Sequence, residues 1–299
     1  MASSRAVADP HAGNTLASRL RDYYALTKPE VNLLILMTTS AGYYLGSEGP
    51  LRVGRLVTTL LGTLLVASGT ATLNQLMERF HDARMRRTAQ RPLVAGRLSG
   101  KEACWFGLSL SLAGGALLAV SVNVLSALLA IGTLLGYLLV YTPLKRKTAL
   151  CTLLGAVPGA MPTLIGWAAA SGSVDRNAWL LFGVLFLWQF PHFLAIALLY
   201  REDYAGAGFR MLPRFDVDGR FTKAEIILFT LVLVLVTLLP VAGRHGAVYS
   251  LIMLAAGAFF IYHTVKLAAS GSRVLASRVV HASVIYLPVV LGTMMAGKA

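Results

Sequence analysis

One stretch of the chain carries acids, an amide and bases at spacings that suit the binding of a metal ion and phosphate groups. Asn74, Glu78 and Asp82 are four residues apart, and on a helix this spacing places their oxygens in one stripe. Such oxygens suit a hard cation such as Mg²⁺, which usually joins one or two carboxylates to substrate phosphates. Arg87 and Arg91 follow, and their guanidinium groups can bind the same phosphates. The stretch therefore predicts a diphosphate site that uses Mg²⁺.

This candidate site begins where a long apolar segment ends. Of the 299 residues, 56% are hydrophobic and 13% are charged, which is too apolar for an ordinary soluble domain. Nine apolar segments are long enough to cross a membrane, so we expect an all-α polytopic membrane protein with nine transmembrane helices. The segments cover residues 31–47, 56–77, 102–121, 124–142, 149–171, 177–199, 224–244, 247–268 and 279–296. Eight spans is the alternative count, because only Val122 and Asn123 separate the third segment from the fourth.

The basic residues indicate how the chain crosses the membrane. If the N-terminus and every second connection lie on one side, 22 of the 27 Lys and Arg residues lie there. The positive-inside rule then places the N-terminus and the long loops in the cytoplasm and the C-terminus outside. Topology and anionic lipid explain the net charge of +14. A nucleic-acid partner is not expected, because the bases form no separate soluble domain.

Two loops of similar length begin with acids and continue with bases. Residues 78–101 follow the second apolar segment, and residues 200–223 follow the sixth and contain Glu202 and Asp203. Four apolar segments separate the loops, which suggests two four-helix halves plus a ninth helix, with both loops facing each other on the cytoplasmic side. Asp203 is then a candidate ligand for the same metal. The polar residues 1–28 lack the apolar core of a signal peptide, so we expect a cytoplasmic tail there.

Two further elements complete a recognisable pattern. Tyr141-Thr-Pro-Leu-Lys145-Arg146 begins at the end of the fourth segment, and Trp188-Gln-Phe-Pro-His192-Phe193 lies near the end of the sixth. With the N-x₃-E-x₃-D-x₂-M-x-R-T-x₂-R-P stretch and the D-Y-x₂-A-G-x₂-M-L-P run that begins at Asp203, the chain resembles the UbiA superfamily of intramembrane prenyltransferases. Within it, the P-H-F and A-G-x₂-M-L-P elements resemble those of the protohaem IX farnesyltransferases. The resemblance runs from about residue 28 to the last segment.

The resemblance implies a UbiA-like domain over residues 29–299 and a specific reaction. A farnesyl group would pass from farnesyl diphosphate to a vinyl group of haem B, and water addition would give haem O and diphosphate. The protein would lie in a bacterial inner membrane, within the lipid bilayer, and a haem A synthase or an oxidase assembly factor would be a downstream partner. By this resemblance, Mg²⁺ is held by Asn74, Glu78, Asp82 and Asp203, and the diphosphate by Arg87, Arg91, Lys145 and Tyr141.

The chain departs from the superfamily pattern at two positions. Glu78 stands where the first motif usually has Asp, and its longer carboxylate still reaches a metal. Many relatives outside the haem branch have a second D-x₃-D motif, but here Asp203 is followed four residues later by Ala207. The number of metal ions is therefore left open.

Three of the candidate residues also have structural interpretations. His192 follows Pro191 near the end of a span, where an ionisable residue could bind haem iron or orient a propionate; the alternative is a histidine that is hydrogen-bonded in the core. Lys145 could serve only the positive-inside rule, and Tyr141 could belong to the aromatic belt.

Two other functions compete with haem farnesylation. A transporter of an amphipathic anion would need ionisable residues near the middle of its spans, whereas the acids here lie at the cytoplasmic ends. Prenylation of an aromatic acid or quinone precursor would use the same chemistry, and only the resemblance argues against it.

Overall fold

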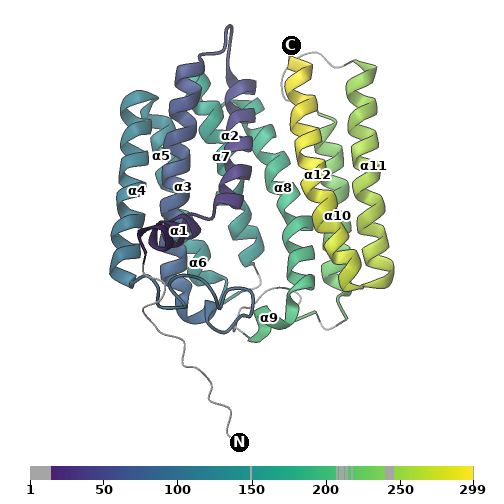
Figure 1. Cartoon of the computed structure of the whole chain (residues 1–299). Helices are drawn as coiled ribbons and strands as arrows, with labels where there is room; N and C mark the ends of the chain where they lie inside the picture. The colour runs from purple at the N-terminus through teal and green to yellow at the C-terminus, as the bar shows by residue number, and fades with distance from the viewer. Residues whose placement is uncertain are drawn as a thin grey trace, which may run out of the picture.

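Long helices make up almost all of the regular structure. The computed structural model describes residues 15–148, 150–206, 208, 212, 215–216, 218–239 and 246–298. No strand occurs in this part of the chain. The elements in chain order are α1 (Leu16–Leu26), α2 (Pro29–Gly46), α3 (Val53–Asp82), α4 (Gly100–Ser121), α5 (Val124–Leu135), the π-helix η1 (Gly136–Tyr141), α6 (Thr142–Leu144), α7 (Cys151–Ser171), α8 (Arg176–Leu199), α9 (Arg201–Gly206), α10 (Arg220–Thr237), α11 (Ala247–Ser270) and α12 (Arg273–Lys298). The long helices run side by side, with the short α1, α6 and α9 in the lower half of the view (Figure 1).

Polar caps set several of the helix boundaries. Ser99 and Glu102 form a capping box at the start of α4, in which each satisfies a backbone N–H of the other. The side chain of Asn123 accepts a hydrogen bond from the backbone N–H of Ser126 at 2.7 Å and so caps α5. The third and fourth apolar segments are therefore two separate helices.

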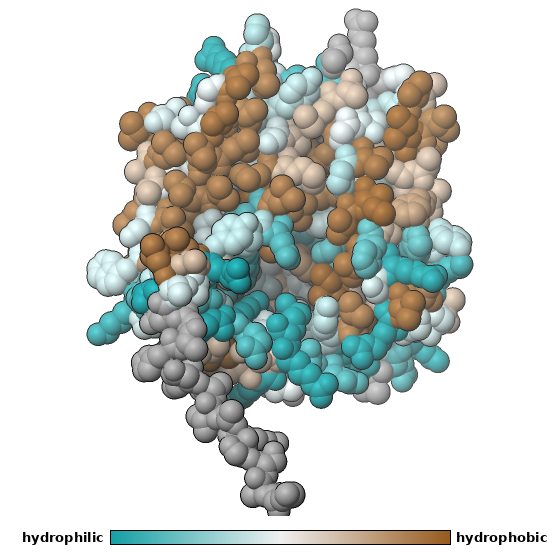
Figure 2. All heavy atoms as spheres, viewed as in Figure 1, coloured by the Kyte–Doolittle hydropathy of each residue, from teal (hydrophilic) through white to brown (hydrophobic). Residues whose placement is uncertain are grey.

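Seven helices are long and apolar enough to cross a membrane. They are Val53–Asp82, Gly100–Ser121, Val124–Leu144, Cys151–Ser171, Arg176–Leu199, Ala247–Ser270 and Arg273–Lys298. The expected count of nine is thus not confirmed, although α2 and α10 also form helices of 18 residues each where spans were expected. In the space-filling view, hydrophobic side chains cover the upper part of the face and hydrophilic ones gather at the lower end (Figure 2).

Helix α7 holds the two halves of the bundle together. Its buried residues include Leu164 and Trp167, which join the core of α8, α10, α11 and α12, and Ile165, which joins the core around α4 and α5. Glycine lets α2 approach α7 closely, because a Cβ at Gly42 would lie 2.2 Å from the backbone oxygen of Thr163.

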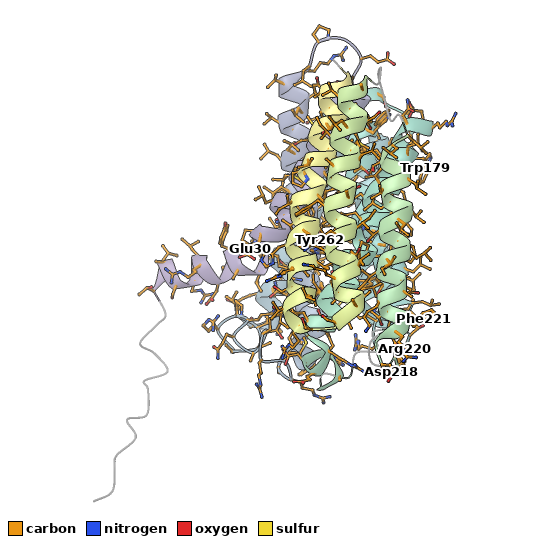
Figure 3. All side chains as sticks on the ribbon, turned by 90° about the vertical axis from the view of Figure 1, so that its right-hand side faces the viewer. Glu30, Trp179, Asp218, Arg220, Phe221 and Tyr262 are labelled. Atoms are coloured by element: carbon orange, nitrogen blue, oxygen red, sulfur yellow. The ribbon has the colours of Figure 1, made fainter. Side chains whose placement is uncertain are left out.

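The segment before α2 is an ordered part of the fold. Residues 1–14 lie outside the described residues, and residues 15–28, which belong to the expected cytoplasmic tail, include the helix α1. Leu26 at its end is fully buried, and its backbone oxygen accepts a hydrogen bond from Gln75 Nε2 at 2.8 Å. In the rotated view, α1 projects sideways from the bundle near Glu30 (Figure 3).

Candidate active site

A cavity of about 490 Å³ lies among helices from both halves of the bundle. Its walls are largely apolar and come from α2, α3, α5, α7 and α8, with Val31, Ile35, Val66 and Ile165 among them. Polar and charged side chains also line it: Lys28, Arg87, Tyr137, Tyr141, His192 and Tyr204. The face seen in Figure 2 is recessed where its hydrophilic and hydrophobic zones meet.

The acidic stripe of α3 is buried. Asn74, Glu78 and Asp82 are 1%, 4% and 1% exposed, so the three residues of the predicted stripe are all enclosed by the protein. Glu78 forms an ion pair with Lys145. Asp82 Oδ2 lies 2.5 Å from Arg91 Nη1. Because buried charges are costly without partners, these bases are what allow the acids to be buried.

The loop after α3 folds back beneath the helix and brings Arg91 to Asp82. Thr88 Oγ1 donates a hydrogen bond to the backbone oxygen of Asp82 at 2.7 Å. Met85, Leu93 and Leu98 of the same loop are buried, and the last two pack with Leu26. Apolar anchors therefore hold this charged loop in place.

Asn74 has a fixed amide orientation. Its Nδ2 donates to Thr142 Oγ1 at 3.0 Å, and Thr142 uses its own proton to donate to the backbone oxygen of Tyr137 at 2.8 Å. The Asn74 Oδ1 atom therefore accepts from Lys28 Nζ at 3.2 Å. This carbonyl oxygen is the atom that the sequence predicts as a metal ligand.

Lys28 is a functional candidate that the sequence reasoning did not find. Its φ of 51° is the only positive φ of a non-glycine residue among the described positions, and such a backbone is sparsely populated and strained. Burial lowers the pKa of Lys28 to about 7, with the charges of Arg91 and Lys145 as further causes. The sequence signal was a Lys-Pro pair, which indicates no more than the start of a helix.

Lys145 is likewise held away from water. Burial lowers its pKa, although the neighbouring carboxylates of Glu78 and Asp82 oppose this shift. Its Nζ atom lies 5.3 Å from the centre of the Tyr141 ring. Lys28, Arg91 and Lys145 lie close enough to repel one another. An anion bound among them is therefore stabilised.

The two acidic loops meet at Arg87. Its guanidinium carbon lies 5.5 Å from the ring centre of Tyr200 and 5.9 Å from that of Tyr204, distances at which cation–π attraction operates. Tyr204 is the neighbour of Asp203 on α9 and lines the cavity. The spacing of the loops in the sequence predicted this proximity, but not the tyrosines that mediate it.

The π-helix η1 places two tyrosines at the cavity. Tyr137 and Tyr141 both line it, and their ring centres are 4.9 Å apart. A π-helical turn shifts the register of the side chains and often marks a functional site. The ring of Tyr141 fills the space beside Gly155, where an added Cβ would lie 2.6 Å from Cε2. Tyr141 thus contacts the site as expected, whereas Tyr137 gave no sequence signal beyond its aromatic ring.

His192 lies on the wall of the same cavity. Its Nδ1 atom is 2.7 Å from Ser283 Oγ on α12, and its ring stacks on Trp188 with the centres 4.6 Å apart. Pro191 precedes it within α8. His192 is therefore hydrogen-bonded, as the structural interpretation expects, and it also lines the cavity, as the functional interpretation expects.

The donor set on α3 fits a single Mg²⁺ ion. Asn74, Glu78 and Asp82 supply one amide and two carboxylate groups from successive turns, and such a set leaves positions for phosphate oxygens and water. Among the described residues, no group of three or more His, Cys, Asp or Glu side chains is close enough to hold a metal. The described residues do not group Asp203 with the acids of α3 in this way, so its role as a ligand stays a prediction.

Comparisons with known proteins identify the family of the chain. Residues 35–291 match the model of the UbiA prenyltransferase family. The chain is 46% identical over 286 residues to a protoheme IX farnesyltransferase of Solibacter usitatus, covering 92% of this chain and 98% of the relative. It is 43% identical to that of Salinibacter ruber, with 90% and 95% covered.

Solved structures show the same fold at low sequence identity. A digeranylgeranylglyceryl phosphate synthase superposes with a TM-score of 0.75 at 18% identity, over 94% of this chain and 98% of the other. A UbiA homolog from Archaeoglobus fulgidus bound to DMAPP and Mg²⁺ superposes with a TM-score of 0.63 at 17% identity, over 91% and 99%. The chain is a membrane prenyltransferase that belongs to the UbiA family and, within it, to the protoheme IX farnesyltransferases.

Proposed function

We propose that the protein transfers the farnesyl group of farnesyl diphosphate to a vinyl group of haem B, with addition of water, to give haem O and diphosphate. The observation that carries this proposal is one apolar cavity with a cationic region, formed by Lys28 and Arg87, and a histidine that also lines it. An allylic diphosphate with its tail in the apolar part would bring its reacting carbon toward the porphyrin.

The charged residues would promote departure of the diphosphate. Mg²⁺, held by Asn74, Glu78 and Asp82 and proposed also to contact Asp203, would supply electrophilic neutralisation of the phosphate oxygens. Lys28, Arg87, Arg91 and Lys145 would bind the same oxygens and stabilise the charge that develops as the C–O bond breaks. Tyr141 would contact the diphosphate from the side of η1. In this arrangement Lys28 would exchange its contact with Asn74 for a phosphate oxygen.

The apolar walls would protect the allylic cation. Val66, Ile165 and their neighbours form part of the cavity wall, and these apolar side chains would keep water away and so delay premature capture of a reactive cation. The new C–C bond forms at the vinyl group, and water then adds to the porphyrin-stabilised cation with loss of a proton. The product stays in the bilayer, where a membrane-bound haem A synthase or an oxidase assembly step is the proposed consumer.

The proposal includes an arrangement in the membrane. Nine spans, with α2 and α10 added to the seven apolar helices, put both loops of the site in the cytoplasm of a bacterial cell and the C-terminus outside. The bias of Lys and Arg toward the loop side supports this orientation.

Mass analysis of haem tests the proposed reaction directly. Haem extracted from membranes that contain the protein should include a species that has gained a farnesyl group and a hydroxyl group, and membranes that contain the Asp82→Asn variant should not. Unmodified haem B together with a prenylated quinone precursor or aromatic acid would contradict the proposal.

A further inference from the structure

Ser283 on α12 contacts two residues of α8 at the cavity wall. Its side chain is fully buried, and its Oγ lies 2.7 Å from His192 Nδ1. Its backbone oxygen accepts a hydrogen bond from Trp188 Nε1 at 2.7 Å. The indole of Trp188 in turn stacks on the imidazole of His192, with the ring planes 18° apart. One residue therefore fixes both the plane and one edge of the histidine ring.

The proton of the Ser283 hydroxyl group has a partner other than His192. Ser283 Oγ donates to the backbone oxygen of Val280 at 2.6 Å, and a carbonyl oxygen can only accept. A hydroxyl group has one proton to donate, so the oxygen of Ser283 accepts at its contact with His192. The donor there is Nδ1–H. In a neutral imidazole the second nitrogen, Nε2, then carries a lone pair and no proton.

We propose that Ser283 is a positioning residue that holds His192 in the Nδ1–H form, so that Nε2 binds the iron of haem B. This inference rests on the proposed function. An unprotonated Nε2 can bind iron but cannot donate a hydrogen bond to a propionate. Of the two roles considered for His192, this form therefore favours binding of the haem iron over orientation of a propionate. Hydrogen bonds to the other ring nitrogen orient and tune metal-binding histidines in this way.

The Ser283→Ala variant separates the two contacts. It removes the hydroxyl that accepts from His192 but keeps the backbone oxygen that accepts from Trp188. Ser283→Thr keeps a hydroxyl group and should preserve the wild-type behaviour. Ser126→Ala is a matched control, because Ser126 is also fully buried and is not among the residues that line the cavity.

The first measurement is the tautomer of His192 in protein without substrate. Nitrogen-15 NMR of labelled histidine, with the signal assigned by its loss in His192→Gln, should show a protonated Nδ1 in the wild type. Ser283→Ala should lose this preference, and Ser126→Ala should keep it. A wild-type His192 protonated at Nε2 would overturn the inference, even if the Ser283 variants failed to fold.

The second measurement is binding of haem B followed by its absorption and magnetic spectra. The wild type should show a histidine-ligated iron, and Ser283→Ala should bind haem about 10-fold more weakly or more, with the KM for farnesyl diphosphate unchanged. Unchanged haem affinity and iron spectra in Ser283→Ala would refute the positioning role. Absence of haem binding by the wild type would instead contradict the proposed function itself, whatever the tautomer.

Discussion

At the scale of single residues, the bases around Asn74 outnumber the acids. Glu78 and Asp82 are paired with Lys145 and Arg91, and Lys28 is bound to the neutral Asn74. Protonation of Lys28, whose pKa is lowered to about 7, therefore gives these residues an excess of positive charge inside the protein. An anion with several oxygens relieves this repulsion, and diphosphate has the required charge and number of acceptors.

Neutralising either acid of α3 should abolish turnover. Glu78→Gln and Asp82→Asn each remove a charge that would hold Mg²⁺, and we expect turnover to fall about 100-fold or more, with a higher Mg²⁺ requirement. Farnesyl transfer is measured over a range of Mg²⁺ concentrations, and an excess of chelator should stop the wild type.

These variants need a control for stability, because both acids are buried. Glu78→Gln removes the carboxylate of a buried ion pair with Lys145, which can destabilise a protein by about 3–5 kcal/mol. Glu102→Gln is the matched control: Glu102 caps α4 and pairs with Arg19, and it does not line the cavity. It should keep full turnover. Normal turnover in the α3 variants would rule out their role in metal binding.

Lys28→Met should weaken the binding of farnesyl diphosphate. Loss of one charge-assisted hydrogen bond to phosphate predicts an increase in KM of about 10-fold or more. Lys147→Met is the control, since Lys147 is exposed in the loop after α6 and should leave KM unchanged. Equal effects of the two substitutions would indicate a general effect of charge and count against a specific role for Lys28.

The residue scale also shows what a sequence can predict about this site. A fixed four-residue spacing on a helix defines a stripe whatever the rest of the fold does, so Asn74, Glu78 and Asp82 could be grouped in advance. The partners come from segments 46 to 68 residues away, as Lys28 and Thr142 do for Asn74. No local pattern encodes such distances, and the burial of the acids follows from those partners.

At the scale of elements, α5 and η1 show a limit of apolar patterns. The segment 124–142 was expected as one span, and it is a continuous helical stretch that changes to π geometry at Gly136 and ends with α6. A π-helical turn contains one more residue than an α-helical turn, and the hydropathy of an apolar segment does not reveal this insertion. Yet this turn brings Tyr137 and Tyr141 to the cavity and positions Thr142 to hold Asn74.

The contact between α2 and α7 should be sensitive to a single methyl group. A Cβ at Gly42 would meet the backbone oxygen of Thr163 at 2.2 Å, and a backbone atom in a packed helix cannot move aside cheaply. We expect Gly42→Ala to lower the free energy of unfolding by about 1–3 kcal/mol, measured as thermal unfolding in detergent. Gly132→Ala is the control, because nothing lies within 4 Å of its added Cβ; a Gly42→Ala protein as stable as Gly132→Ala would contradict this account.

At the scale of the whole molecule, the site requires two distant loops on one side of the membrane. Four helical crossings, α4, α5 to α6, α7 and α8, separate the loop of Arg87 from that of Tyr204. An even number of crossings returns the chain to the side where it began. The contact of Arg87 with Tyr200 and Tyr204 therefore agrees with an even number of crossings between the two loops. The excess of Lys and Arg in these loops indicates that they lie on the cytoplasmic side.

Cysteine labelling tests this arrangement and the orientation together. Cysteines are placed singly at Gln90 and Gly206, which are exposed in the two loops, and at Ser173, which is exposed between α7 and α8, in an active background without Cys104 and Cys151. Because α8 begins at the end of the bundle opposite α9 (Figure 1), Gln90→Cys and Gly206→Cys should react only from the cytoplasm and Ser173→Cys only from outside. If Gln90→Cys and Gly206→Cys reacted only from outside and Ser173→Cys only from the cytoplasm, the proposed orientation in the membrane would be reversed, but both loops could still form one active site. Reaction of Gln90→Cys and Gly206→Cys from opposite sides would mean that the crossings between them are odd in number, and no single active site could then use both loops.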